Sequence, residues 1–366
     1  MKIKLQIIVQ VFLLTISVAQ NNNVDLDSNH TNKIEYAFYP MAFYTPETQF
    51  AFGAGGIVFT KFGLEKNISP SKIQISSYYT TNSQYLFSAM PTLYFSGSAE
   101  IISNSKFVYS RELSKFYGVG NNTGNIKNPD YEIGLFRFYT ELSYGTGIIE
   151  NLHLGLIYEF TSNKILDKQK NYELITNKVI GSNGGNTSGL GIILSVDSRK
   201  NIFFPTESIY CKLRMIFMGR DWGSDFEYNR QVFDFRKYFN LGKENVLASQ
   251  VYIESTSGDV PFFMLPTLGG SEKMRGYFLG RFRDEIYLTW QIEYRKIFWK
   301  RFGGVAFLGM GDVASKFNQL DLAQFKYAYG FGLRYVFDEK EKLNLRMDLG
   351  FGKSTSGIYF ALEEAF

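Results

Sequence analysis

The sequence predicts an all-β protein: a 16-stranded transmembrane antiparallel β-barrel with a long inward-folded sixth extracellular loop. Three observations support this fold class. Apolar and polar residues alternate strictly over long segments of the chain. Many of these segments reach about ten residues, which is the length that a tilted strand needs to cross a bilayer. Their number is even, as closure of a bacterial barrel with both ends on one side requires.

The alternation is clearest in the C-terminal third of the chain. In 343–351 the odd positions are Leu, Leu, Met, Leu and Phe, and the even positions are Asn, Arg, Asp and Gly. The segments 327–337 and 286–294 repeat this period of two, with apolar side chains on one face and mostly polar residues or glycines on the other. Such a pattern is typical of a strand with one apolar face. A soluble sandwich would turn that face into a core, whereas a membrane barrel turns it toward lipid.

Strand length favours the membrane barrel, because strands of soluble proteins average about five or six residues. The longest predicted connections, 112–130, 165–186 and 258–283, all follow odd-numbered strands, so we expect them on the outer face of the membrane. The predicted strands are 35–44, 50–61, 71–80, 83–95, 97–111, 131–146, 151–164, 187–198, 208–219, 225–239, 245–257, 284–298, 302–314, 326–337, 342–353 and 357–366.

The chain divides into three predicted parts. Residues 1–19 have the pattern of a signal peptide, because Lys2 and Lys4 precede an apolar stretch that ends in small residues. Residues 20–34 are rich in Asn and Asp and predict a short disordered leader. Residues 35–366 form the barrel. A helical membrane span is excluded after the first part, since no stretch of about 18 consecutive apolar residues follows it. We therefore expect an integral protein of the bacterial outer membrane.

Patterns of catalytic and metal-binding residues are missing from the sequence, so we expect no enzyme, no cofactor and no metal. The two histidines, His30 and His153, have no cysteine or carboxylate at metal-ligand spacing. Cys211 is the single cysteine, which excludes a disulfide framework. A formal net charge of +4 is small for 366 residues and indicates no nucleic-acid partner.

The segment 268–284 reads LGGSEKMRGYFLGRFRD and separates two alternating segments. Its glycines permit sharp reversals and close backbone approach. The rigid guanidinium of Arg275 suits a bidentate partner in a confined polar space. Glu293 lies on the polar register of the following strand and is the predicted partner. A loop held by this pair would plug or brace the lumen, whereas an exposed loop with incidental basic residues is the alternative interpretation.

The same segment resembles the inward-folded sixth extracellular loop of the BamA/TamA family, the outer-membrane barrels of the bacterial surface antigen type. Glu293 matches the acidic position on strand twelve that the resemblance implies as partner of the loop arginine, and 343–366 resembles the family's last hairpin. The resemblance covers the C-terminal half well and the N-terminal half more loosely. An arginine-glycine-aromatic signature and a preceding glycine pair carry it in the loop: Arg275, Gly276, Tyr277, Gly269 and Gly270.

The sequence departs from the family in two respects. The family's strand-thirteen motif has an aspartate two residues after a phenylalanine, but Gly309 stands at that distance from Phe307. Asp312 lies three residues further, on the opposite face by alternation, so Arg275 and Glu293 are the stronger pair of the implied three-way lock. Members that fold other barrels carry periplasmic POTRA domains before the barrel, and we expect the barrel-only form that lacks them.

The resemblance implies a weak seam between the first and last strands, 35–44 and 357–366. In the family this seam opens toward lipid and templates or admits a client strand, which pairs with unpaired backbone groups. Pro40 lies in the first strand and cannot donate a ladder hydrogen bond. The predicted seam and C-terminal signal residues of the last strand are Phe360, Leu362 and Phe366.

We therefore expect a non-enzymatic barrel that assists the insertion or translocation of proteins or lipids at the outer membrane. Its expected partners are outer-membrane lipids and a polypeptide client or a separately encoded periplasmic helper. The alternatives are a passive porin-like channel and a structural barrel that anchors a separate periplasmic partner.

Overall fold

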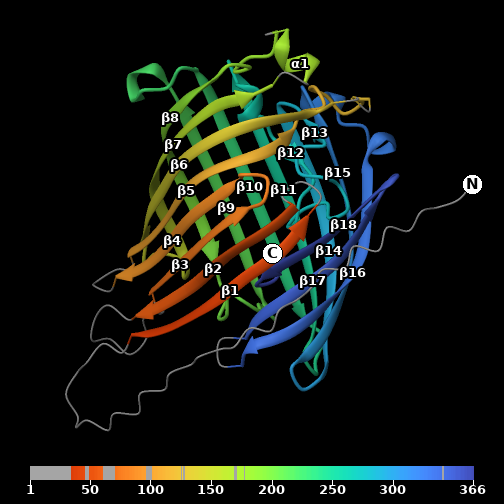
Figure 1. The fold of residues 1–366 in the computed structure, drawn as a ribbon. Helices are drawn as coiled ribbons and strands as arrows, with labels where there is room; N and C mark the ends of the chain where they lie inside the picture. The colour runs from red at the N-terminus through yellow and green to blue at the C-terminus, as the bar shows by residue number, and fades with distance from the viewer. Residues whose placement is uncertain are drawn as a thin grey trace, which may run out of the picture.

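Sixteen antiparallel strands form one sheet that curls into a barrel (Figure 1). The predicted signal peptide, 1–19, and all but the last residue of the predicted leader, 20–34, lie outside the part of the chain that the structure describes. This structure is a computed structural model that describes residues 34–45, 49–60, 71–95, 101–124, 126, 128–168, 171–176, 178–339 and 342–366.

Each strand of the barrel pairs with the next one along the chain, except that a long loop with two small strands separates β11 from β14. The barrel strands are β1 (Glu35–Thr45), β2 (Gln49–Thr60), β3 (Ser71–Thr80), β4 (Tyr85–Phe95), β5 (Ile101–Lys115), β6 (Asp130–Gly145), β7 (Leu152–Asp167), β8 (Gly184–Asp197), β9 (Ser208–Met218), β10 (Tyr228–Asn240), β11 (Asn245–Gly258), β14 (Ile286–Trp299), β15 (Phe302–Ala314), β16 (Lys326–Asp338), β17 (Leu343–Gly352) and β18 (Thr355–Leu362).

Little regular structure lies outside the barrel strands. The two small strands are β12 (Thr267–Leu268) and β13 (Phe282–Arg283), which pair with each other. None of the described helices is long and apolar enough to cross a membrane. These helices are α1 (Tyr172–Ile175) and the 3-10 turns Arg220–Trp222, Phe262–Met264, Phe317–Gln319 and Leu322–Gln324.

The predicted number of strands is confirmed, and most predicted edges lie within about three residues of the observed ones. β5 was predicted to end at residue 111, but it continues to Lys115, because 111–115 pairs with 130–134 of β6. The connections after β5, β7 and β11 are long and lie at one end of the barrel, called here the loop end, where Figure 1 shows α1. The opposite end is called the turn end.

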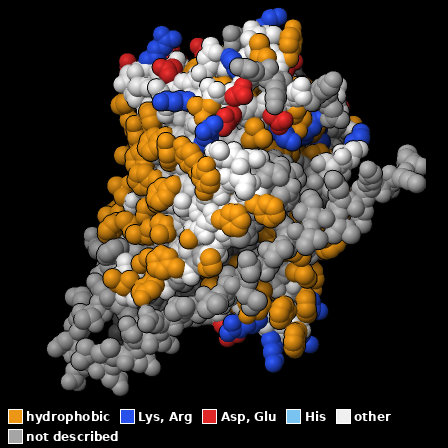
Figure 2. Space-filling view, viewed as in Figure 1, with side chains coloured by type: hydrophobic (Ala, Val, Ile, Leu, Met, Phe, Trp, Pro, Cys, Tyr) orange, Lys and Arg blue, Asp and Glu red, His pale blue; other side chains and the backbone are white. Residues whose placement is uncertain are grey.

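Side chains alternate between the two surfaces of the sheet as the period of two predicts. Arg334 on β16 and Arg346 on β17 are buried on the inner face. Figure 2 shows hydrophobic side chains over the middle of the outer face, with charged side chains gathered toward its ends. This distribution fits a barrel surrounded by lipid. The outward residues of β16 are exposed aromatic or aliphatic side chains: Tyr327, Tyr329, Phe331, Leu333 and Tyr335.

The last strand ends earlier than predicted, which is a correction to the strand 357–366. β18 stops at Leu362, and the next residue, Glu363, has a φ of 69° that turns the chain away from the sheet. Glu364 then accepts hydrogen bonds from Arg334 Nε and Asn344 Nδ2, both at 2.8 Å. These hydrogen bonds hold the tail inside the barrel, so it does not continue the β17–β18 ladder.

The end of this tail is buried in the barrel. Phe366, predicted as a residue of the seam, packs instead in an apolar cluster with Phe204, Tyr238 and Val246. Its main-chain oxygen accepts a hydrogen bond from Arg295 at 2.7 Å. The other predicted residues at the two end strands stay in the sheet: Pro40 in β1, and Phe360 and Leu362 in β18.

We predict that Phe366→Ala destabilises the barrel, because it leaves a cavity in this apolar cluster. The expected loss in the free energy of unfolding is about 3–5 kcal/mol. The loss of stability is detected as a lower temperature for the heat-induced change in gel migration. Phe317→Ala removes an exposed ring at the loop end and is the matched control. Equal transition temperatures for the two variants would contradict a stabilising role for the tail.

Candidate functional site

The connection between β11 and β14 folds back on itself as a hairpin. β12 and β13 pair at its base, and nearer the tip the backbone N–H of Gly270 donates to the carbonyl of Tyr277 at 3.1 Å. Gly269 and Gly270 have φ values of 110° and 111°, a conformation that glycine adopts without strain. The hairpin tip, 271–276, carries Arg275.

Arg275 lies between two carboxylates from different strands. Its Nη2 is 2.5 Å from Glu293 Oε2 on β14, and its Nη1 is 2.6 Å from Asp348 Oδ2 on β17. All three side chains are fully buried. The guanidinium also lies over the ring of Phe307 on β15, 3.6 Å from the ring centroid. The planar guanidinium can meet both carboxylates at once, which a single ammonium group does less well. Arg275 thus connects the loop to one wall of the barrel.

This arginine belongs to a larger buried set, called here the arginine cluster. Glu293 also binds Arg295 at 2.7 Å. Asp348 also binds Arg334 at 2.6 Å and Arg346 at 3.0 Å. Removing one partner of a buried ion pair costs about 3–5 kcal/mol, because the other charge loses its compensation. The members of the cluster therefore depend on one another: Arg275, Arg295, Arg334 and Arg346 with Glu293, Asp348 and Glu364.

The hairpin tip approaches β17 so closely that the contact needs glycine. Gly276 has a φ of 115°, and a Cβ added to Gly350 would lie 2.6 Å from the backbone of the tip. The N–H of Gly276 donates to Tyr359 Oη on β18 at 2.8 Å. Tyr277 Oη accepts from the N–H of Lys353 at 3.0 Å. The tip is therefore attached to the last hairpin as well as to β14.

Two further arginines hold the base of the hairpin to another part of the barrel. Arg283 donates to the carbonyls of Phe262 and Lys115, at 3.1 and 3.2 Å. Burial lowers the pKa of its guanidinium. Arg281 donates to the hydroxyl and the carbonyl of Thr123 at 2.9 and 3.0 Å. The base is thus fixed to β5 and the connection that follows it, so the loop joins distant strands.

The predicted site residues separate into two groups. Arg275 and Glu293 lie in contact, and Gly276 and Tyr277 bind the last hairpin. Asp312 lies outside the arginine cluster. Its carboxylate is 2.5 Å from Lys326 Nζ and accepts from Asn121 Nδ2 at 3.0 Å. Alternation put Asp312 on the outward register, yet its side chain is fully buried with these partners at the loop end.

Asp348 is the second carboxylate that binds Arg275, and the sequence reasoning missed it. It lies on the polar register of 343–351, the same signal that singled out Glu293. Alternation gives the face of a strand but not the height of a residue in the barrel, so it could not pair Asp348 with the loop. Gly309, where the family pattern has an aspartate, lies beside the loop instead, and a Cβ added there would be 3.5 Å from Met274 Sδ. The second carboxylate thus comes from β17, not from β15.

The charged side chains of this site bind one another. Among the described residues, no group of three or more His, Cys, Asp and Glu side chains could hold a metal ion. The central carboxylates, Glu293 and Asp348, are both occupied by arginines. Buried carboxylates bound in this way hold the loop in one position.

Solved structures that are similar to this chain include those of BamA and Wzi. BamA from Haemophilus ducreyi, in a crystal structure that lacks POTRA domains 1–3, has a TM-score of 0.57 and 13% sequence identity, covering 96% of this chain and 74% of that chain. Wzi from Escherichia coli, an outer-membrane protein described as a carbohydrate-binding β-barrel, has a TM-score of 0.33 and 8% identity, covering 90% of this chain and 81% of that chain. No curated protein sequence matched.

The likeness to BamA concerns the fold alone, because the sequence identity is low. The match to a family model is more specific. The model of the Omp85 superfamily domain matches residues 72–337, which is more than half of the chain and includes the loop with Arg275. The chain therefore belongs to the Omp85 superfamily of outer-membrane β-barrel proteins.

Proposed function

We propose that this barrel assists the insertion or translocation of polypeptides, or of lipids, at the outer membrane through a lateral seam between β1 and β18, without chemistry of its own. One observation carries the proposal. The sheet begins with β1 and ends with β18, so these two strands are its edges. Edge strands can offer backbone donors and acceptors to an incoming strand.

The two sides of the seam support this reading. Pro40 lies within β1 and removes one N–H donor from that strand. Beyond β18, the tail reaches across to β3, where Glu363 accepts hydrogen bonds from Gln74 at 3.0 Å and Lys72 at 3.5 Å. These side chains are only partly buried, so the contact is weak compared with a strand ladder. The seam would thus be closed by side chains that can separate.

The loop supports the proposal by holding the β18 side of the seam in place. Arg275 binds β14 and β17, and Gly276 binds Tyr359 of β18. One side of the seam is therefore backed by a fixed wall while the other can move. The inward-lying loop, which the arginine cluster fixes, also argues against a passive porin-like channel. A steady open conductance in planar bilayers, without insertion activity, would favour that alternative.

The proposal implies an orientation. Residues 1–19 would direct export, the loop end would face the outside, and the turn end would face the periplasm. A polypeptide client, or a separately encoded periplasmic helper that brings it, would then meet the barrel at the turn end. Outer-membrane lipids would surround the outward aromatic side chains.

We predict that Arg275→Gln destabilises the barrel by about 3–5 kcal/mol, because Glu293 and Asp348 keep their charge without a partner from the loop. The expected results are a lower unfolding temperature, protease cleavage within 268–284, and loss of client insertion into liposomes. Arg220→Gln removes an exposed arginine that pairs with Glu227 and is the matched control. If Arg275→Gln left insertion and protease resistance unchanged, Arg275 would not be what fixes the loop to the barrel wall.

We predict that joining β3 to the tail stops insertion. In a Cys211→Ser background, Gln74→Cys and Glu363→Cys are linked by a short bifunctional methanethiosulfonate and released by a reductant. Insertion should fall to the level of protein-free liposomes and return on reduction. The control pair is Ser76→Cys with Ser88→Cys, whose hydroxyls lie 2.7 Å apart on β3 and β4, away from the seam. Equal insertion by both linked proteins would exclude opening at the seam.

A further inference from the structure

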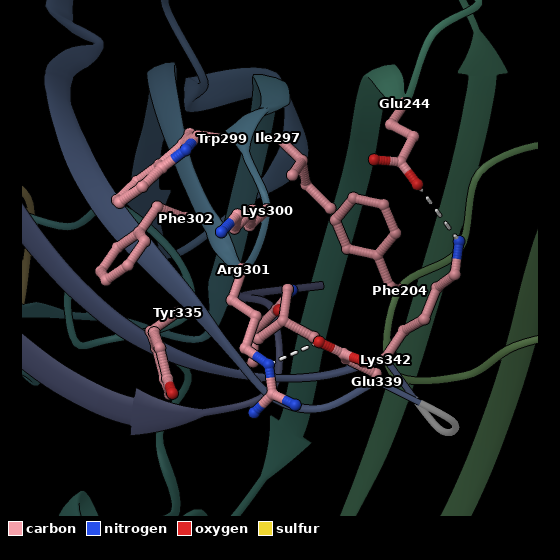
Figure 3. A pocket seen from close by; sticks show the side chains of 12 residues that line it. Phe204, Glu244, Ile297, Trp299, Lys300, Arg301, Phe302, Tyr335, Glu339 and Lys342 are labelled. Carbon is pink, nitrogen blue, oxygen red and sulfur yellow. Dashed lines mark hydrogen bonds and ion pairs between the residues drawn. The ribbon is translucent and has the colours of Figure 1, made fainter.

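A cavity of about 690 Å³ opens at the turn end of the barrel, and the function proposed above does not use it. It lies where the turn between β14 and β15 meets the turn between β16 and β17, and the turn between β10 and β11 adds Glu244. Figure 3 shows three aromatic rings on one side of it and Phe204, Glu244 and Lys342 on the other. The cavity therefore lies at the turn end, between the aromatic rings and the charged side chains of the turns.

The aromatic side of the cavity has the character of a membrane interface. Trp299 and Phe302 stack at 5.5 Å, and Phe302 contacts Tyr335 at 5.3 Å between ring centroids. These rings are exposed, with 60% of Trp299 and 43% of Phe302 accessible. Tryptophan and tyrosine concentrate at the level of lipid headgroups, because their rings are apolar and their edges are polar. This side of the cavity therefore suits the boundary between acyl chains and headgroups.

The other side of the cavity is charged, and its cations outnumber its carboxylates. Lys300, Arg301 and Lys342 line it together with Glu244 and Glu339. Arg301 pairs with Glu339 and Lys342 with Glu244, but these side chains are between 44% and 64% exposed. Exposed ion pairs of this kind contribute little free energy, so an anionic ligand can replace the carboxylate.

Lys300 lacks even such a partner. Its Nζ lies 5.7 Å from the centroid of the Trp299 ring, and among the described residues no carboxylate lies within ion-pair distance of it. Its φ of 45° belongs to the tight turn between β14 and β15, and Figure 3 shows its side chain between the aromatic rings and Phe204. A free cation beside exposed aromatic rings suits an amphiphile with an anionic head.

A buried polar atom at the cavity also has no partner. Asn344 lines the cavity with only 1% of its surface exposed, and its Oδ1 has no hydrogen-bond donor in the structure. Its Nδ2 is already used, because it donates to Glu364. An unsatisfied buried acceptor carries a free-energy cost that a ligand N–H or O–H would remove. Hydroxyl and ammonium groups of lipid heads are donors of this kind.

We propose that this cavity binds the phosphate-bearing headgroup of a glycerophospholipid of the surrounding membrane. Lys300, Arg301 and Lys342 hold the phosphate, Asn344 accepts from a donor of the headgroup, and the acyl chains leave past Trp299 and Phe302 into the bilayer. Basic pockets beside an apolar surface recognise phospholipid heads by this combination of charge and position. The lipid would join the turns of β14–β15 and β16–β17 at the rim of the wall that holds the loop.

The test uses quenching of Trp299 by phosphatidylethanolamine with brominated acyl chains. Trp222→Phe and Trp290→Phe leave Trp299 as the single tryptophan of the full chain, which has three. The cavity variant combines Lys300→Gln with Lys342→Gln. The control variant combines Lys200→Gln with Lys243→Gln and so removes two lysines that do not line the cavity. Each protein in detergent is first shown to fold by its heat-modifiable gel migration, and Lys300→Gln alone replaces the double variant if the latter does not fold.

We expect the cavity variant to need about 30-fold more lipid for half-maximal quenching, because each of the two lysines contributes roughly one kcal/mol near a phosphate and every 1.4 kcal/mol is a factor of ten. The control variant should need the same amount as the parent. The proposal is overturned if both double variants lose affinity equally, or if neither does. It is also overturned if brominated diacylglycerol, which has no phosphate, quenches Trp299 in the parent as well as the phospholipid does, because contact with acyl chains alone would explain that result.

Discussion

A guanidinium buried in the barrel is stable only beside carboxylates, and the positions of the loop, β14 and β17 depend on this requirement of Arg275. Its charge is removed from water, which is costly unless partners compensate it. Glu293 and Asp348 supply that compensation from two strands, so the loop can hold only one position. Gly276 and Gly350 allow the close approach, because side chains at either place would collide with the opposing backbone. The loop, β14 and β17 thus form a single unit.

The same charges extend this unit to the end of the chain. Asp348 also binds Arg334, and Arg334 binds Glu364 in the tail. Arg295 connects Glu293 to the main-chain oxygen of Phe366. A change at the loop tip therefore alters the partners of the tail, although the two are separated by many residues of sequence. Such mutual dependence makes the effects of single substitutions non-additive.

The sequence was sufficient for the barrel but only partly for the site. A period of two fixes which side chains share a face, so the strands and the inward register of Glu293 could be predicted. Height along the barrel depends on strand tilt and register, which no single segment encodes, so Asp348 was missed. The tail was assigned to the last strand because its residues continue a strand-like pattern. The partners that draw Glu364 inward, Arg334 and Asn344, lie on other strands and become neighbours only in the folded barrel.

The two edges of the proposed seam, β1 and β18, are unequal, and this follows from the arginine cluster. β18 pairs with β17, which carries Asp348, and Tyr359 of β18 accepts from the backbone of the loop tip. Moving β18 would therefore disturb buried ion pairs that cost several kcal/mol to break. β1 pairs with β2, and Glu363 of the tail contacts Lys72 of β3 with side chains that are 34% and 12% exposed. Solvent screens this pair more than the fully buried pairs of the arginine cluster, so it contributes less free energy. A seam with one edge fixed by fully buried charges and the other held by a partly exposed ion pair would open by displacement of β1, while the loop keeps β18 in place as the template.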